Sequence, residues 1–260
     1  VTLQKNGLGR LVLIAAFYLI WSLVKSWRGH HPPVSKYQIP TEIFLLAITL
    51  WIIRGPGGYS FSATAVSTLA FGFLVFFALS IMKGRNLDIK ARTLMIIVVL
   101  IITLGIVTFF SSGAVIRAVA PFLGRNSTLT DRTAVWEALL PVAMQRPIVG
   151  SGVGGFWTPI TRKAFDISEG HNGYLDVLLG GGFIAILLVS IFLLSFCRKA
   201  HQELSYDFDW GSLCICFLMM TLVHNITESS IHTFTSQLTA VVMFLSVTSS
   251  NADRRKQDLV

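Results

Sequence analysis

Long stretches without a charged residue constrain this chain more than any other feature of its sequence. An α-helix needs about 20 mostly apolar residues to cross the hydrocarbon of a bilayer. Seven runs are candidates, namely residues 11–24, 43–53, 55–82, 93–110, 177–197, 211–227 and 229–252. The second run is short and needs residues 38–42 to complete a crossing. The sequence therefore predicts an all-α, polytopic membrane protein with about seven transmembrane helices.

The composition agrees with this interpretation. Charged residues make up 13% of the chain and hydrophobic residues 53%, and the mean hydropathy is +0.68. Soluble domains carry about 25% charged residues, so we exclude a disordered, fibrous or soluble nucleic-acid-binding protein and expect no nucleic acid partner. The three cysteines lie in or beside apolar runs, and their odd number argues against a disulfide framework.

Basic residues between the apolar runs predict the orientation of the chain. They cluster in residues 83–92, directly after the fifth run, in the C-terminal tail and between the first two runs. Basic short loops stay in the cytoplasm, and seven crossings place these four stretches on one side. We therefore expect four transmembrane helices in residues 1–110, a long, partly helical periplasmic loop in residues 111–172, and three transmembrane helices with a cytoplasmic tail in residues 173–260.

The long outer loop is unusual for its positive charge. It holds six of the 21 basic residues of the chain, which runs against the positive-inside tendency. They are Arg117, Arg125, Arg132, Arg146, Arg162 and Lys163. Arginine is the residue best suited to paired hydrogen bonds with phosphate. Residues 131–145 are predicted to be helical, and Pro147 is expected to end that helix.

Three glycines in the same loop have the spacing of a nucleotide-binding motif. Gly150, Gly152 and Gly155 match the G-x-G-x-x-G pattern of dinucleotide sites. Such a site also needs a preceding strand, a following helix and a distal acidic residue, and this context is missing here. The glycines more simply predict a tight turn in which the backbone closely approaches a ligand or a neighbouring helix.

Further polar residues gather where the loop meets the apolar runs. His171 can accept a proton from a hydroxyl near neutral pH, and Asn172 can cap the helix that follows. Asp176 is an ionisable group entering the membrane, which makes it a functional candidate. Glu228 lies in a second polar cluster, HNITESS, between the last two runs. An interfacial polar pair and a solvated turn remain the alternatives to a functional site.

Together these motifs resemble the signature of the bacterial O-antigen ligase superfamily. The pattern is Arg132-x-x-x-Trp136, then Arg-Pro-x-x-Gly150-x-Gly152, then Phe, then His171-Asn172-x-x-Leu, then a glycine-rich start to an apolar helix. The resemblance covers roughly residues 40–230. The superfamily includes O-antigen ligases, O-antigen polymerases, protein O-oligosaccharyltransferases and exopolysaccharide polymerases. The Leu-Thr-x-Arg-Thr and Gly-Phe-Trp details look most like the exopolysaccharide polymerase branch.

The resemblance implies an integral membrane glycosyltransferase of the bacterial cytoplasmic (inner) membrane. It would transfer or polymerise glycan from an undecaprenyl-diphosphate donor onto a sugar hydroxyl at the periplasmic face, with inversion and without a metal or another cofactor. The acceptor would be a glycan or a lipid A–core molecule. Membrane lipid and other polysaccharide export components are further candidate partners.

The resemblance also implies roles for individual residues. By match to the family motif, Arg132 would bind the diphosphate in catalysis and His171 would be the base. Further candidate diphosphate ligands are Arg125, Arg54, Arg146 and Arg162. Supporting residues would be Asn172, Trp136, Gly150, Gly152, Asp176 and Glu228.

Two observations keep alternatives open. The family usually has a basic residue where this chain has Phe61, so Arg54 would have to supply that charge. The chain begins at Val1, and the family has more spans than seven, so the chain resembles its C-terminal portion. Five further spans before Val1 would make it complete and would fit the predicted orientation. A transporter or flippase for a lipid-linked anionic substrate, or an inactive, truncated remnant, are the alternatives.

Overall fold

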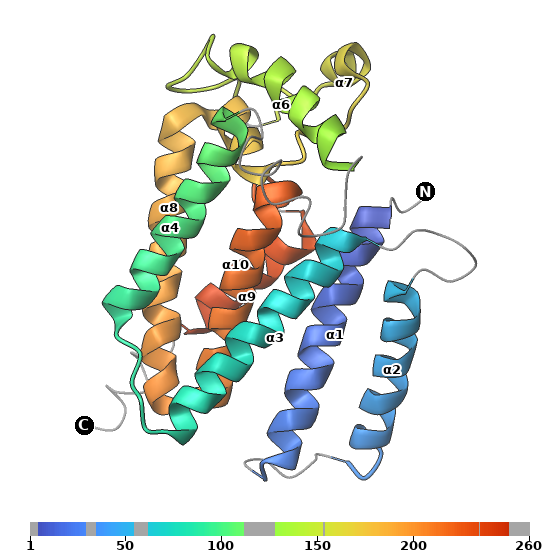
Figure 1. Ribbon diagram of the computed structural model, residues 1–260, viewed down its shortest axis with the longest axis vertical. Coiled ribbons are helices and arrows are strands. Elements are labelled where there is room, and N and C mark those ends of the chain that lie inside the picture. Colours follow the sequence, from blue (N-terminus) through green and yellow to red (C-terminus); the bar gives the residue numbers. More distant parts are fainter. Residues whose placement is uncertain are drawn as a thin grey trace. The chain divides into compact units, whose positions relative to one another are not determined.

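The computed structural model describes residues 5–29, 35–54, 62–111, 128–152, 154–233 and 235–249. Every regular element within these ranges is a helix (Figure 1). In chain order they are α1 (Lys5–Trp27), α2 (Gln38–Ile53), α3 (Ala63–Gly84), α4 (Ala91–Phe110), α6 (Thr128–Ala143), α7 (Pro159–Phe165), α8 (Gly173–Tyr206), α9 (Phe208–Thr227) and α10 (Gln237–Thr248). The predicted all-α fold class is confirmed for this described part of the chain.

Five of these helices are long and apolar enough to cross a membrane, namely α1, α3, α4, α8 and α9. Helices α2 and α10 lie in the second and seventh predicted runs, but they have only 16 and 12 residues. A 16-residue helix is about 24 Å long, whereas the hydrocarbon is about 30 Å thick. The helices are those of a multi-pass membrane protein, while seven crossings, the periplasmic side of the loop and the three predicted regions stay predictions.

The last helix begins later than the sequence predicts because the chain first makes a polar turn. Asn225 Oδ1 accepts hydrogen bonds from the backbone N–H groups of Ser230 and Ile231, at 2.9 and 3.0 Å. The Nδ2 of Asn225 donates to Ser230 Oγ at 2.8 Å. A side chain that bonds the backbone ahead of it favours a turn over a continuing helix. Regular helix therefore resumes only at Gln237.

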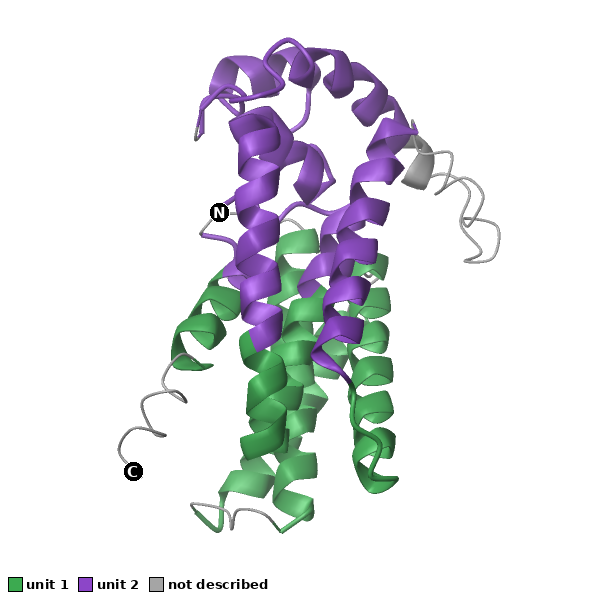
Figure 2. Cartoon of the chain, turned by 90° about the vertical axis from the view of Figure 1, so that its left-hand side faces the viewer, with its two compact units in different colours: residues 1–89, 199–220, 240–260 green, residues 90–198, 221–239 purple. Residues whose placement is uncertain are grey.

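The chain divides into two compact units (Figure 2). Unit 1 consists of Val1–Ile89, Lys199–Met220 and Ala240–Val260, and unit 2 consists of Lys90–Arg198 and Thr221–Thr239. In unit 1, α1 packs on α2 and α3. The candidate functional residues of the long loop and of the two polar clusters belong to unit 2.

In unit 1 the first turn of α9 is fixed to α1. Trp21 Nε1 donates a hydrogen bond to the backbone carbonyl of Asp209 at 2.9 Å. The carboxylate of Asp209 pairs with Arg28, with 3.4 Å between Oδ1 and Nη1. Farther along the same two helices, the rings of Phe17 and Phe217 lie 5.4 Å apart, centroid to centroid. Apolar packing and one buried carboxylate thus join helices that are distant in sequence.

In unit 2 the start of α8 lies against α4 and the last turn of α9. Gly105 on α4 makes room for the ring of Tyr174, because a Cβ at Gly105 would lie 2.2 Å from that ring. The hydroxyl of Tyr174 donates to the carbonyl of Leu222 at 3.0 Å. Asn172 Nδ2 donates to the carbonyls of Gly105 and Ile226, at 3.2 and 3.0 Å. These contacts fix the point at which the loop enters α8.

Replacing Gly105 tests this packing. We expect Gly105→Ala to lower the free energy of unfolding by about 1–3 kcal/mol, because the added methyl group overlaps the Tyr174 ring. Gly84→Ala is the matched control, since a Cβ at Gly84 meets no atom within 4 Å. Thermal unfolding of the purified protein in detergent measures both. Equal unfolding midpoints for the two variants would contradict the close approach of α4 and α8.

Candidate functional site

Helix α6 brings the first site residues against the turn that precedes α8. Its buried face consists of Thr133, Trp136, Leu139 and Ala143, at the spacing of a helix packed on one side. The helix predicted for residues 131–145 is confirmed, with bounds shifted to Thr128–Ala143. Trp136 is fully buried, and its Nε1 donates to the carbonyl of Gly170 at 2.8 Å. Trp136 therefore packs the loop on the turn that carries His171.

Asp176 holds the other side of the same turn. The N–H of Gly170 donates to both carboxylate oxygens of Asp176, at 3.1 Å each. Trp157 Nε1 donates to Asp176 Oδ1 at 2.9 Å, and the hydroxyl of Ser229 donates to Oδ2. Asp176 is 2% exposed, and these hydrogen bonds compensate for the burial of its carboxylate. Asp176 thus fixes the backbone of the turn at Gly170.

The turn places His171 in an uncommon backbone conformation. Its φ is +50°, in the left-handed region that residues other than glycine rarely adopt. Such strain persists where the surrounding structure over-determines the backbone. Here Gly170 is bonded on both its N–H and its carbonyl side. The backbone conformation of His171 is therefore held by the contacts of the residue before it.

Asn172 begins α8, as the sequence predicts. Its Oδ1 accepts from the backbone N–H groups of Tyr174 and Leu175, both at 3.0 Å. These are N–H groups that have no partner inside the helix, so Asn172 is an N-cap. The side chain is fully buried. The role of Asn172 in this structure is to fix the helix end next to His171.

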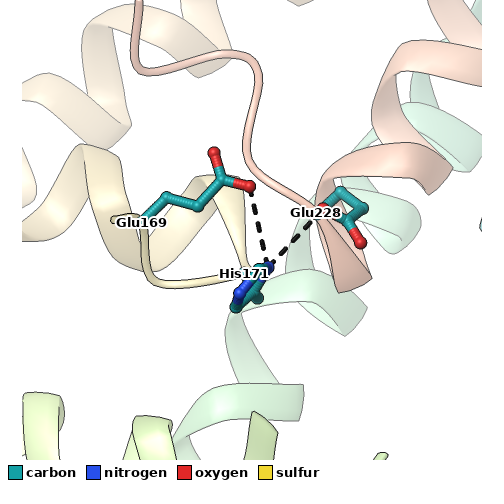
Figure 3. Close-up of side chains that lie close together, drawn as sticks. All are labelled: Glu169, His171 and Glu228. Carbon is teal, nitrogen blue, oxygen red and sulfur yellow. Dashed lines mark ion pairs between the residues drawn. The ribbon is translucent and has the colours of Figure 1, made fainter. Parts of the chain in front are cut away.

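Glu228 connects the two residues expected to carry the chemistry. One carboxylate oxygen, Oε1, forms an ion pair and hydrogen bond with Arg132 Nη2. The other, Oε2, lies 3.6 Å from His171 Nδ1, and Glu169 Oε1 lies 3.6 Å from the same nitrogen (Figure 3). The Glu228 side chain is 1% exposed, whereas those of Arg132 and His171 are 17% and 27% exposed. We call Arg132, Glu169, His171 and Glu228 the Glu228 cluster.

The charges of this cluster shift the pKa values of its members. Contact with the Glu228 carboxylate raises the pKa of His171, and Glu169 adds to the effect, while burial and Arg132 oppose it. Burial by itself would raise the pKa of Glu228, but contact with His171 and the charge of Arg132 outweigh it and lower the pKa. Glu228 is therefore a carboxylate, and His171 holds a proton to higher pH than a histidine in water.

Three residues of the cluster have the chemistry of metal ligands. Glu169, His171 and Glu228 each offer one ligand atom, and these atoms lie within 4.8 Å of one another. Histidine nitrogen and carboxylate oxygen are both zinc ligands. The positively charged guanidinium of Arg132 already forms an ion pair with Glu228. A bound cation and Arg132 would therefore compete for the same carboxylate.

The other described arginines that were predicted to bind diphosphate are exposed and lie outside the Glu228 cluster. Arg146 and Arg162 are exposed, while the ion pairs of the cluster are made by Arg132 and His171. Arg54 is exposed at the end of α2 and belongs to unit 1. Arg125 and Phe61 lie outside the described residues.

Two side chains near the site were missed by sequence reasoning. Glu169 stands two positions before His171, and this proximity in the motif SEGHN was the available signal. His232 contacts Ser229 Oγ at 2.9 Å through Nδ1 and lies 3.9 Å from Asp176 Oδ2. It follows a polar turn and has no helical periodicity that would have pointed to the site.

The glycine turns are confirmed at Gly150 and Gly152. Their φ values are +63° and +88°, which residues with a side chain rarely adopt. A Cβ at Gly150 would lie 2.6 Å from the backbone of Gly180 and Gly181. This glycine therefore allows a close approach of two backbone segments.

Comparison with known proteins finds similarity to the exopolysaccharide production protein ExoQ of Rhizobium meliloti (strain 1021). The two are 27% identical over 104 residues, which is 35% of this chain and 24% of that protein. The similarity thus spans about a quarter of that relative's length. No protein-family model matches the chain, and no solved structure matches it. The similarity is consistent with the resemblance seen in the motifs.

Replacing the shared carboxylate tests the electrostatics of the cluster. We expect Glu228→Gln to lower the pKa of His171, because the neighbouring negative charge that favours the imidazolium is removed. His171 would then lose its proton at a lower pH than in the unchanged chain. NMR titration of isotope-labelled histidine measures the change. Glu137→Gln, at an exposed position of α6, is the control, and an unaltered His171 pKa in Glu228→Gln would contradict the contact.

Proposed function

We propose that this chain is an integral membrane glycosyltransferase that acts on a polyprenyl-diphosphate-linked glycan. It transfers or polymerises that glycan onto a sugar hydroxyl at the outer face of the cytoplasmic membrane. The observation that carries the proposal is the position of Glu228 between Arg132 and His171. The arrangement joins a phosphate-binding cation to a histidine base. Similarity to an exopolysaccharide production protein supports the same class of reaction.

In the proposed reaction the neutral form of His171 acts as the general base, and its raised pKa makes that form a stronger base. Its Nδ1 faces the carboxylates of Glu169 and Glu228, so Nε2, on the other side of the ring, accepts the proton of the acceptor hydroxyl. Carboxylates 3.6 Å from Nδ1 favour the tautomer with its proton on that nitrogen and stabilise the imidazolium that forms. The hydroxyl oxygen bonds to the anomeric carbon from the face opposite the leaving group, and the configuration at that carbon inverts.

Arg132 stabilises the leaving group. As the bond between the anomeric carbon and the diphosphate oxygen breaks, the electron pair stays with the polyprenyl diphosphate, whose negative charge grows. A guanidinium has five N–H donors, so Arg132 can contact phosphate oxygens while Nη2 stays on Glu228. Positive charge placed where negative charge develops lowers the barrier of the reaction. Glu228 positions this donor relative to His171.

A transporter for a lipid-linked anionic substrate is the second candidate. The break in α8 at Gly182 favours it, since discontinuous transmembrane helices form the substrate sites of many transporters. A liposome assay with a polyprenyl-diphosphate-linked sugar separates the two functions. Movement of the lipid across the bilayer without a new glycosidic bond would support transport, and elongation or transfer would support the glycosyltransferase.

Substitution of the two central residues tests the glycosyltransferase. We expect His171→Ala and Arg132→Ala each to reduce the polymer or ligated glycan by at least about 100-fold, the usual contribution of a general base or a charge-stabilising donor. Glycan profiles on gels from a deletion strain that carries each variant measure the loss. Lys163→Ala, at an exposed position of α7, should leave the profile unchanged. Normal profiles for both His171→Ala and Arg132→Ala, at equal membrane levels, would contradict the proposal.

The accumulated intermediate distinguishes the two forms of the reaction. Single repeat units on the lipid carrier are expected if the chain is a polymerase, because exported units are then no longer joined to one another. Long chains on the carrier are expected if it is a ligase. Mass spectrometry of the lipid fraction from the His171→Ala strain reads the length directly.

Chelation tests whether the cluster needs a metal. We expect EDTA to leave transfer by the purified protein unchanged, since Arg132 supplies the positive charge at Glu228. Activity that falls in EDTA and returns with one divalent cation would instead make Glu169, His171 and Glu228 a metal site. Inactivation of Arg132→Ala in the presence of that cation would then show whether both charges are required.

A further inference from the structure

Helix α8 is interrupted inside its apolar run. Gly182 has φ +63° and ψ −162°, which is not helical. The break lies about 8 Å beyond the start of the apolar run at residue 177, at 1.5 Å per residue. Breaking a helix removes the partners of several backbone N–H and carbonyl groups. Hydrocarbon cannot replace them, so another part of the protein must.

Residues 147–151 of the loop supply those partners. The N–H groups of Phe183 and Ile184 donate to the carbonyls of Pro147 and Ile148, at 2.7 and 3.2 Å. In the other direction the N–H of Ser151 donates to the carbonyl of Leu179 at 2.9 Å. The loop backbone therefore runs along the break and bonds both of its sides.

Glycines on both segments make this approach possible. A Cβ at Gly182 would lie 2.2 Å from the carbonyl oxygen of Ile148. A Cβ at Gly150 would lie 2.6 Å from Gly180 and Gly181. The two glycine motifs, which are separate in the sequence, thus fit against each other at one place. That place lies at the level of the break and not at the start of α8.

The side chains around this contact are apolar and uncovered. Ile148 and Val149 are 64% and 62% exposed, and Phe183 and Ile184 are each 47% exposed. We call these four residues the loop–helix patch. Leu187, one turn farther along α8, is 60% exposed as well, so the patch continues the apolar surface of the helix. An apolar surface that continues that of a membrane-spanning helix fits lipid acyl chains.

We propose that residues 147–151 are a re-entrant segment, which enters the membrane beside α8 and exposes Ile148 and Val149 to lipid acyl chains. The broken helix bonds the carbonyls of Pro147 and Ile148 and the N–H of Ser151, and such protein partners are what non-helical backbone needs at this depth. The segment begins shortly after α6, which ends at Ala143, so it ties the helix that carries Arg132 to the membrane. The proposal is independent of the chemistry of the Glu228 cluster.

Spin labels measure the depth of the segment. The labels are attached to Ile148→Cys and Val149→Cys, with Lys163→Cys on α7 as the reference at a charged, exposed position. The protein is reconstituted into vesicles of phosphatidylcholine and phosphatidylglycerol. Relaxation by oxygen, which concentrates in hydrocarbon, is compared with relaxation by a nickel chelate, which stays in water. The unchanged chain gives the background of its three buried cysteines.

We expect labels at positions 148 and 149 to show high oxygen and low nickel accessibility, with a ratio at least about tenfold above that at position 163, as for sites facing hydrocarbon. Nickel accessibility equal to that at position 163 would overturn the proposal, since the segment would then lie in water. Low accessibility to both reagents would also overturn it, because the side chains would then be covered by protein.

Discussion

The site depends on one buried carboxylate with two neighbours. Glu228 is almost fully enclosed, and an enclosed charge is costly unless it is paired and hydrogen-bonded. Arg132 on one oxygen and His171 near the other meet that requirement. The three residues come from α6, from the turn before α8 and from the chain just after α9. Removing Arg132 would leave the buried carboxylate of Glu228 without this ion pair, and removing Glu228 would take the shared carboxylate away from both Arg132 and His171. The cluster therefore also holds these segments together.

A second buried carboxylate, that of Asp176, has a different role from that of Glu228. Asp176 bonds the backbone of Gly170 and the indole of Trp157, so it shapes the turn and leaves the charge balance of the cluster to Glu228. Trp136 holds the same glycine from its carbonyl side. The strained conformation of His171 follows from these contacts. In the proposed reaction, a backbone held in this way positions the histidine for its role as general base.

Much of this could be predicted from the sequence, for physical reasons. Apolar runs must become helices because hydrocarbon leaves no other partner for the backbone, and the cap at Asn172 follows from its side chain. Pairwise contacts could not be predicted in this way. Arg132 and Glu228 are 96 positions apart, and no local pattern links them. Likewise Gly150 and Gly182 each look like part of an isolated glycine motif, and the short α10 results from side-chain bonds of Asn225 that hydropathy does not register.

The proposed reaction breaks the bond between a glycan and a polyprenyl diphosphate and forms a glycosidic bond. The most direct test incubates the purified protein with a polyprenyl-diphosphate-linked repeat unit and an acceptor glycan. One polyprenyl diphosphate should be released for each new glycosidic bond, and NMR of the product should show the anomeric configuration opposite to that of the donor. Release of diphosphate without a new bond, or a product that keeps the donor configuration, would contradict the account.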